Sequence, residues 1–216
     1  MVIAIDGPSG AGKGTLARTV AERLGYTHVD TGAMYRAVAW KAQQDGLPLD
    51  DDGIVSRLAE QADIVQQDGR TAIDGHDVTS EIRTPVIDKA ATSVARLPHV
   101  REALVRRFRE LGAGGAVVME GRDIGTVVFP DADLKFYIDA SPEERARRRA
   151  SDPAHTGGQG SLELVQSDIA ARDQSDSTRS VAPLARANDA IYIDTTSMPI
   201  EAVVTHVLTL IEARLE

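Results

Sequence analysis

A glycine-rich segment near the N-terminus constrains the fold of this chain more than any other part of the sequence. It reads Gly7-Pro8-Ser9-Gly10-Ala11-Gly12-Lys13-Gly14-Thr15, and it lies between an apolar run at residues 2–5 and an apolar-periodic segment at residues 16–24. In the order strand, glycine-rich loop, helix, backbone N–H groups can wrap closely around phosphate oxygens. The helix N-terminus adds partial positive charge, and Lys13 adds a full one. We therefore expect an α/β domain that binds the phosphates of a nucleotide.

The residue after the lysine narrows this prediction. In the common pattern G-x-x-x-x-G-K-[ST], a hydroxyl directly after the lysine holds magnesium. Here Gly14 occupies that position, and the hydroxyl comes one residue later, at Thr15. This G-K-G-T order resembles the loop of nucleoside monophosphate kinases rather than that of GTPases or motor ATPases. A plain glycine-rich turn with a surface lysine is the alternative, but the flanking strand and helix favour the phosphate site.

Composition excludes several other classes of protein. The chain has 216 residues, of which 42% are apolar, which suits one α/β domain with insertions. Its net charge of −9 argues against a general nucleic-acid binder, so local arginines must hold any anionic ligand. The absence of cysteine excludes disulfides, thiol catalysis and cysteine zinc sites. No apolar run is long enough to span a membrane, and the N-terminus reads as a strand, so we expect a cytoplasmic protein.

Strand and helix patterns alternate along the chain. Short apolar runs typical of strands buried on both faces occur at residues 2–5, 27–29, 116–119, 134–138 and 190–193. Helical patterns occur near residues 13–24, 33–44, 98–111, 142–150, 162–175 and 199–215. This alternation predicts a parallel sheet with right-handed crossovers, with ligands at the carboxyl ends of its strands.

Two stretches interrupt the alternation. Residues 46–93 form an insertion between the second and third parallel strands, and residues 64–73 alternate around Asp68-Gly69, which predicts a hairpin. Residues 151–160 are polar and glycine-rich and lie between two helices. They are a surface loop, and their place beside an arginine-rich helix favours a lid that closes over phosphates.

Charged residues follow the second and third strands. After the second strand, Thr31 could cap the next helix, and Arg36 falls about one turn in, on the loop side. Glu120 ends the third strand, where an acidic residue commonly holds magnesium, often through water. Arg122 and Asp123 adjoin it. The alternatives are ordinary helix capping with a surface arginine, and a salt-bridged turn.

Two later helices carry further arginines. Arg145, Arg148 and Arg149 share one face of the helix at residues 142–150, whereas Arg147 does not. The helix beyond the glycine-rich loop presents charges on one side: Arg172, Asp173, Asp176 and Arg179. Solvent-exposed helix faces with ion pairs would have the same sequence pattern, and they remain the alternative for both helices. The histidines (His28, His76, His99, His155 and His206) show no metal or catalytic spacing and read as structural or exposed, and Tyr35 and Trp40 read as helix packing.

Together these motifs resemble those of bacterial cytidylate kinases over essentially the whole chain. The matching segments are Ile5 to Thr15, Asp30-Thr31-Gly32-Ala33-Met34-Tyr35-Arg36, Glu81-Ile82-Arg83-Thr84, Gly121-Arg122-Asp123-Ile124-Gly125-Thr126-Val127-Val128-Phe129-Pro130 and Val181-Ala182-Pro183-Leu184. Many kinases share the phosphate loop, but G-R-D-x-G-T-V-V-F-P together with D-[ST]-G-A-x-Y-R is specific.

The resemblance implies a reaction and an architecture. It implies a transferase of pyrimidine metabolism that passes a phosphoryl group from ATP, with Mg²⁺, to CMP or dCMP in one direct step without a covalent intermediate. It also implies a monomer with a P-loop NTPase fold and a five-stranded parallel sheet. The single domain would have a core at residues 1–45, 94–150 and 177–216, a monophosphate-binding insertion at 46–93 and a lid region at 151–176.

The resemblance also implies roles for individual residues. The loop from Gly7 to Thr15 would bind ATP. The catalytic residues would be Lys13, Arg122, Arg148 and Arg179. Glu120 would hold magnesium. Substrate-binding positions are Asp30, Thr31, Arg36, Thr92, Arg101, Arg122, Asp123, Arg172, Asp176 and Arg179. Among these, Arg36, Arg122 and Arg179 would grip the monophosphate, Arg101 and Asp123 would lie near the base, and Arg172 and Asp176 near the sugar. A serine that contacts the base in some relatives aligns with Thr92, and Ser93 is adjacent. Thr31 replaces another serine of the family pattern. Glu120 occupies a position where the family often has aspartate.

Two other functions remain as alternatives. One is a P-loop kinase for another small molecule, such as UMP, AMP, GMP, thymidylate or shikimate, which would lack this acceptor-side set of charges. The other is a nucleotide-dependent switch protein. A GTPase would carry an N-K-x-D motif, whereas this chain has only Ala187-Asn188-Asp189-Ala190.

Overall fold

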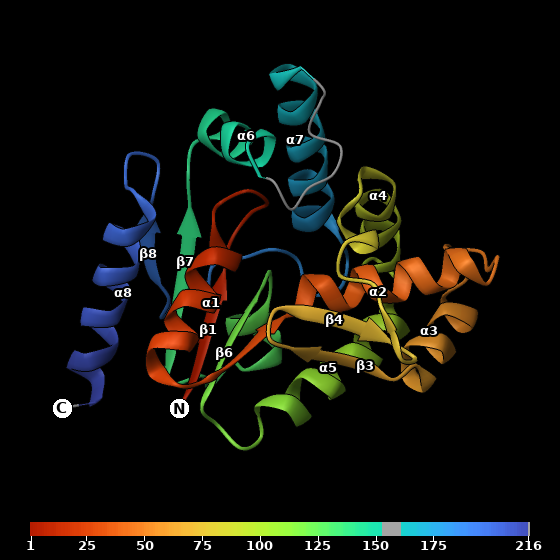
Figure 1. Cartoon of the computed structure of the whole chain (residues 1–216), viewed down its shortest axis with the longest axis horizontal. Helices are drawn as coiled ribbons and strands as arrows, with labels where there is room; N and C mark the ends of the chain where they lie inside the picture. Colours follow the sequence, from red (N-terminus) through yellow and green to blue (C-terminus); the bar gives the residue numbers. More distant parts are fainter. Residues whose placement is uncertain (153–160, 216) are drawn as a thin grey trace.

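The computed structural model describes residues 1–152 and 161–215 and contains a five-stranded sheet with helices on both faces (Figure 1). The strands are β1 (Val2–Asp6), β2 (Thr27–Asp30), β6 (Val117–Gly121), β7 (Leu134–Asp139) and β8 (Ile191–Asp194). They pair in parallel in the order β2-β6-β1-β7-β8. This confirms the predicted α/β fold, and each strand begins and ends within two residues of its predicted bounds.

Each face of the sheet packs against its own helices. Helices α1 (Lys13–Leu24) and α8 (Ile200–Leu215) cover one face, where their apolar side chains meet Ile3 and Ile5. Helices α2 (Thr31–Gln44) and α5 (Pro98–Gly112) cover the other face, where Ala4 and Met119 point. Successive strand residues face opposite sides, so both faces of a continuous apolar strand are buried.

The insertion is richer in structure than its sequence indicates. The predicted hairpin is confirmed as β3 (Ile64–Gln67) and β4 (Arg70–Ile73), joined by Asp68 and Gly69, which both have positive φ as a tight primed turn requires. A short third strand, β5 (His76–Asp77), pairs with β4. Helices α3 (Asp52–Gln61) and α4 (Pro85–Val94), with the 3₁₀ turn η1 (Glu81–Arg83) between β5 and α4, were not predicted.

Two helices stand over the edge of the sheet at which the strands end. They are α6 (Pro142–Ala150) and α7 (Leu162–Thr178), which pack against each other above the glycine-rich loop (Figure 1). Residues 153–160, which make up most of the predicted lid loop, lie outside the described residues. Among those that are described, no helix combines the length and the apolar character needed to cross a membrane.

A π-helical segment, η2 (Ile124–Val128), directly follows β6 and was not predicted. The carboxylate of Asp6, at the end of β1, accepts the backbone N–H groups of Ile124 at 2.8 Å and Gly125 at 2.7 Å. Because these bonds tie the segment to the carboxyl end of the neighbouring strand, they fix the position of Arg122 and Asp123, which lie between β6 and η2.

Candidate active site

The glycine-rich loop between β1 and α1 has a backbone that only glycine adopts readily. Gly7, Gly10 and Gly12 have φ values of 147°, 77° and 90°. A Cβ on Gly7 would lie 2.0 Å from the carbonyl oxygen of Ile138, and one on Gly10 would lie 2.9 Å from that of Arg145. The loop therefore passes directly beneath β7 and α6. Gly12 begins α1 without a side-chain cap, which leaves the first N–H groups of the helix available to an anion.

Lys13 lies within the loop rather than on the surface. Its side chain is buried, and its Nζ donates to the carbonyl oxygen of Pro8 at 2.7 Å. Burial, together with the charge of Arg122, lowers the pKa of Lys13 to about 7, although the charges of Glu120 and Asp6 oppose the shift. The interpretation of a surface lysine is thus wrong. The ammonium is held where an arriving phosphate would replace lost hydration and restore its charge.

Helices α6 and α7 hold the loop from above. Arg145 donates to the carbonyl oxygen of Ser9 at 3.0 Å and pairs with Asp173, which also accepts the N–H of Ser9 at 3.0 Å. Arg148 donates to the carbonyl oxygen of Ala11 at 3.2 Å. Arg145 therefore orders the loop, whereas Arg148 lies at the edge of the phosphate-binding space.

The predicted difference between Arg147 and its neighbours also holds. Arg147 is the most exposed of the four arginines on α6, at 64% of its side chain, and it pairs with Glu144. Glu144 also binds Arg148 at 2.8 Å, and Thr195 accepts two hydrogen bonds from the same guanidinium. Arg148 is thus oriented by fixed partners before any ligand arrives.

Opposite the loop, arginines pair with carboxylates at the ends of β6 and α7. Arg122 donates to Asp176 at 2.8 Å. Burial opposes the ionisation of Asp176, yet the charges of Arg122, Arg172 and Arg179 outweigh it and hold the pKa of Asp176 below its usual value. Arg122 is therefore placed by this ion pair and by a bond from its Nη1 to the carbonyl oxygen of Gly121 at 3.3 Å, and its side chain lines the cavity.

A second, deeper pair of arginines shares Asp123. Arg101 and Arg179 donate to the two oxygens of this carboxylate at 2.5 Å and 3.2 Å, and all three side chains are nearly fully buried. The guanidinium of Arg101 also lies 5.4 Å from the centre of the Tyr35 ring. Tyr35 Oη and Arg101 Nε have no hydrogen-bond partner among the described residues. Buried polar atoms of this kind are costly unless a ligand satisfies them.

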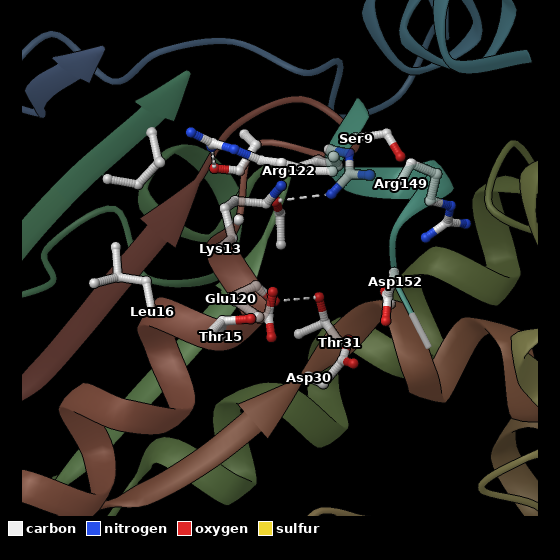
Figure 2. Close-up of a pocket in the computed structure, with 18 of the residues that line it drawn as sticks. Ser9, Lys13, Thr15, Leu16, Asp30, Thr31, Glu120, Arg122, Arg149 and Asp152 are labelled. Carbon is white, nitrogen blue, oxygen red and sulfur yellow. Dashed lines mark hydrogen bonds between the residues drawn. The ribbon is translucent and has the colours of Figure 1, made fainter. Parts of the chain in front are cut away.

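Two predictions about the helix after β2 need correction or refinement. Thr31 does not cap α2; Asp30 does, by accepting the N–H of Ala33 at 2.8 Å. Thr31 is instead the first residue of the helix, and its hydroxyl donates to the backbone oxygen of Glu120 at 2.7 Å (Figure 2). The short side chain of Thr31 can reach β6 because β2 and β6 are paired neighbours in the sheet. Arg36 lies one turn further on, as predicted, and its Nε donates to Asp88 at 3.1 Å.

Glu120 occupies the centre of the site, close to the start of α1. Its Oε1 lies 3.1 Å from Nε2 of His28 and would lie 3.2 Å from a Cβ at Gly14. His28 was read as structural or exposed, yet it lines the same cavity. Within the described residues, no three histidine, aspartate or glutamate side chains gather as a metal cage. This donor set suits an ion that is held by one carboxylate, by phosphates and by water.

These residues surround one cavity with a volume of about 620 Å³. Every residue predicted for the site lines it except Gly7 and Pro8, which lie behind the loop. In Figure 2, Lys13, Glu120, Arg122 and Arg149 border the same open space. Thr92 also lines the cavity, whereas its neighbour Ser93 is exposed and turns back to the carbonyl oxygen of Lys89. The Thr92 hydroxyl likewise donates to the carbonyl oxygen of Asp88 at 2.9 Å, so it is the position of Thr92 on the cavity wall that distinguishes it from Ser93.

Sequence reasoning missed three contributors to this site. Asp88, on α4, binds arginines from three other helices, but it lies in a short helix without a motif. Arg149 was placed on the correct helix face, but no role was predicted for it. Arg83, just before α4, lines the cavity. It belongs to the segment 81–84 that matched the resemblance, which is the signal that could have identified it.

Fold and site together define a class of protein. A glycine-rich loop with a buried lysine faces a cavity lined by arginines, on a five-stranded parallel sheet, and this arrangement is typical of P-loop kinases that act on small molecules. Among solved structures, shikimate kinase from Bacteroides thetaiotaomicron has this fold, with a TM-score of 0.53 and 13% identity over 98% of both chains. An uncharacterised protein from Eubacterium ventriosum has it too, with a TM-score of 0.53, 10% identity and 98% of both chains covered.

Sequence comparison identifies the family. The model of the cytidylate kinase family matches residues 3–213. The cytidylate kinase of Pelotomaculum thermopropionicum is 49% identical over 98% of this chain and 96% of its own length. That of Clostridioides difficile is 44% identical over 97% of both chains. The chain belongs to the cytidylate kinase family.

Proposed function

We propose that this protein transfers the γ-phosphoryl group of ATP to CMP or dCMP, giving ADP and CDP or dCDP. One observation carries the proposal: a single cavity joins the phosphate-binding loop to a separate arginine-rich wall. A nucleotide hydrolase needs only the first of these, whereas a kinase for a charged acceptor needs both. Membership of the cytidylate kinase family supports this choice of acceptor.

The donor half of the site is the loop from Gly7 to Thr15. Its N–H groups and the N-terminus of α1 would hold the ATP phosphates, with Lys13 as the mobile charge. Arg148, which is anchored by Glu144 and Thr195, lies where it can neutralise charge that develops on the transferring group.

The acceptor half is the wall of arginines. Arg36, Arg122 and Arg179 would grip the monophosphate, because a planar guanidinium binds phosphate oxygens in pairs and stays charged. Arg172 and Asp176 would lie near the sugar.

Recognition of the base belongs to the deepest part of the cavity. Arg101 and Asp123 would lie beside the cytosine, with Thr92 contributing a hydroxyl. The orphaned Nε of Arg101 supports this assignment, since a polar ring edge would satisfy it.

Magnesium fits the residues present. Glu120 is the carboxylate for it, since Gly14 leaves the space in front of its Oε1 clear of a side chain. When bound with ATP, the ion would neutralise charge on the β- and γ-phosphates. Asp30, whose pKa is lowered by Arg36 and the N–H of Ala33 against the effect of burial, would hold a second negative charge at the same edge.

The chain's own residues then act by positioning. A monophosphate is already nucleophilic, so the site needs no strong base, and alignment with charge neutralisation supplies the rate. The lid region at residues 151–176 would exclude water that could otherwise accept the phosphoryl group. We also propose a cytoplasmic monomer that binds neither nucleic acid nor membrane, in keeping with its net charge of −9.

A coupled assay of ADP release tests the function directly. The acceptors are CMP, dCMP, UMP, AMP, GMP and shikimate, each at several concentrations with Mg-ATP. We expect the highest kcat/KM for CMP or dCMP. The Lys13→Ala variant should lose turnover by orders of magnitude while its circular dichroism spectrum stays unchanged. A higher kcat/KM for UMP, AMP, GMP or shikimate than for both CMP and dCMP would contradict the proposal.

A further inference from the structure

One carboxylate collects arginines from three separate helices. Asp88 lies on α4, within the insertion, and it accepts hydrogen bonds from Arg36 on α2 at 3.1 Å and from Arg172 on α7 at 3.2 Å. Arg149 on α6 binds the other oxygen of the same carboxylate. Asp88 therefore connects the insertion to the helices that stand over the phosphate loop.

The three arginines and Asp88 differ in their position relative to the cavity. All three arginines line the cavity, but Asp88 does not. Arg36 reaches Asp88 through Nε and leaves its terminal nitrogens off this carboxylate, with Nη1 lying 4.0 Å from Asp30. Arg149 and Arg172 each use one terminal nitrogen for Asp88. The carboxylate thus holds the arginines from behind the cavity wall, and it does not occupy the space that a ligand would fill.

Charge explains why such a carboxylate is needed. The three partly buried guanidinium groups repel one another, and the effect on Arg149 is the clearest. Burial and the charges of Arg36 and Arg172 together lower the pKa of Arg149 to about 10, although the charge of Asp88 opposes them. The three arginines outnumber Asp88, and although Asp30 also lies 4.0 Å from Arg36, an excess of positive charge remains that suits a phosphate monoester carrying about −1.5 to −2 at neutral pH.

We propose that Asp88 is a positioning residue for the acceptor: it holds Arg36, Arg149 and Arg172 so that their remaining N–H groups face the phosphate and the adjoining sugar of the incoming nucleotide. The proposal rests on the proposed function only in requiring a phosphorylated acceptor. It differs from the usual role of a buried ion pair, because its effect is on the affinity of a substrate that Asp88 does not touch.

Steady-state kinetics of Asp88→Asn test the proposal. The amide keeps the shape but removes the charge, so the arginines are left to repel one another and lose their common orientation. We expect the KM for CMP to rise about tenfold or more, with a smaller fall in kcat and a KM for ATP within about twofold of wild type. Asp88→Glu keeps the charge on a longer arm and should give an intermediate KM for CMP.

The matched control is Asp63→Asn. Asp63 lies in the same insertion, is 74% exposed and pairs with Arg107, so the variant removes one acidic charge and one arginine partner away from the cavity. Both KM values should stay at the wild-type level. A purely structural role for Asp88 would instead lower thermal stability and leave the KM for CMP in the folded protein unchanged.

Three outcomes would overturn the proposal. An unchanged KM for CMP in folded Asp88→Asn would show that the arginines need no such support. A lower KM would show that Asp88 competes with the phosphate. If Asp88→Asn does not fold, Asp88→Glu decides, and a wild-type KM for CMP in that variant overturns the idea. If the wild type prefers another monophosphate, the proposed function fails, and the same variants are judged on the KM for that acceptor.

Discussion

At the scale of single residues, sequence reasoning succeeded where chemistry and backbone position coincide. Glu120 and Arg122 follow a buried strand, and parallel strands bring their carboxyl ends to one edge of the sheet. Asp88 could not be found in this way, because its partners Arg36, Arg149 and Arg172 lie on other elements, and only the tertiary packing brings them together. Tyr35 was read as helix packing, and its edge contact with Phe108 bears this out, but the ring also supports Arg101.

The protonation of Lys13 should make ATP binding depend on pH. Its lowered pKa of about 7 means that the ligand-free side chain is mostly neutral at pH 8, whereas bound phosphates favour the ammonium. Binding of a non-hydrolysable Mg-ATP analogue should therefore take up a proton at pH 8 but not at pH 6. The affinity should fall as pH rises above 7, by at most about tenfold per pH unit.

Isothermal titration calorimetry in two buffers with different ionisation enthalpies measures this uptake. At pH 8 the observed enthalpy should differ between the buffers by the linked proton. Lys13→Met is the control, since any uptake that it retains belongs to the phosphates. Equal proton uptake by the wild type and Lys13→Met at pH 8 would show that Lys13 is already charged in the free protein.

At the scale of elements, the alternating pattern identified the long helices and all five strands of the central sheet, since their apolar periods are clear over many residues. The missed elements are short or locally irregular. Helices α3 and α4 lie within the insertion and have ten residues each, and the first N–H groups of the π-helical segment η2 bind Asp6, which lies far away in the sequence. The bounds of the insertion and of the lid region stay predictions.

The contact between the phosphate loop and α6 predicts a specific effect of Gly10→Ala. The added Cβ would lie 2.9 Å from the carbonyl oxygen of Arg145, so the loop and α6 must separate. We expect the KM for ATP to rise several-fold, with a smaller change in the KM for CMP. Steady-state kinetics with each substrate varied in turn measure the two values.

Gly25→Ala is a matched control for backbone strain. Gly25 also has a positive φ, of 66°, but a Cβ there meets nothing within 4 Å. This variant should cost about 1–3 kcal/mol of stability through its left-handed backbone and leave both KM values unchanged. If Gly10→Ala behaves in the same way as Gly25→Ala, the clash with α6 has no bearing on ATP binding.

At the scale of the whole molecule, the insertion and the sheet share one hydrophobic core. Val55 of α3, Ile73 of β4 and Val94 of α4 belong to the same buried cluster as Ala4 and Met119 of the central sheet. No sequence pattern indicated this continuity, because it depends on how α2 and α5 pack between the two sheets. The insertion is therefore part of one cooperative core, although its chain segment looks separable.

This continuity predicts a single unfolding transition. Trp40, the one tryptophan of the chain, lies on α2 and packs against the shared cluster, so its fluorescence reports on the insertion side of the core. The urea midpoint of the unfolding transition followed by Trp40 fluorescence should coincide with the midpoint followed by far-ultraviolet circular dichroism, which reports on all the helices. Two separate midpoints, with fluorescence changing first, would show that the insertion unfolds on its own.

The bare Cα of Gly14 has a consequence for redesign of the nucleotide loop. Because Glu120 already extends to within 3.2 Å of where a Cβ would be, the loop residue and the strand-end acid divide one fixed volume between them. A serine or threonine in the loop and a glutamate on β6 would compete for that volume, and a shorter aspartate would release it. The residues at positions 14 and 120 are thus sterically coupled, and a redesign that places a hydroxyl residue at position 14 should change position 120 as well.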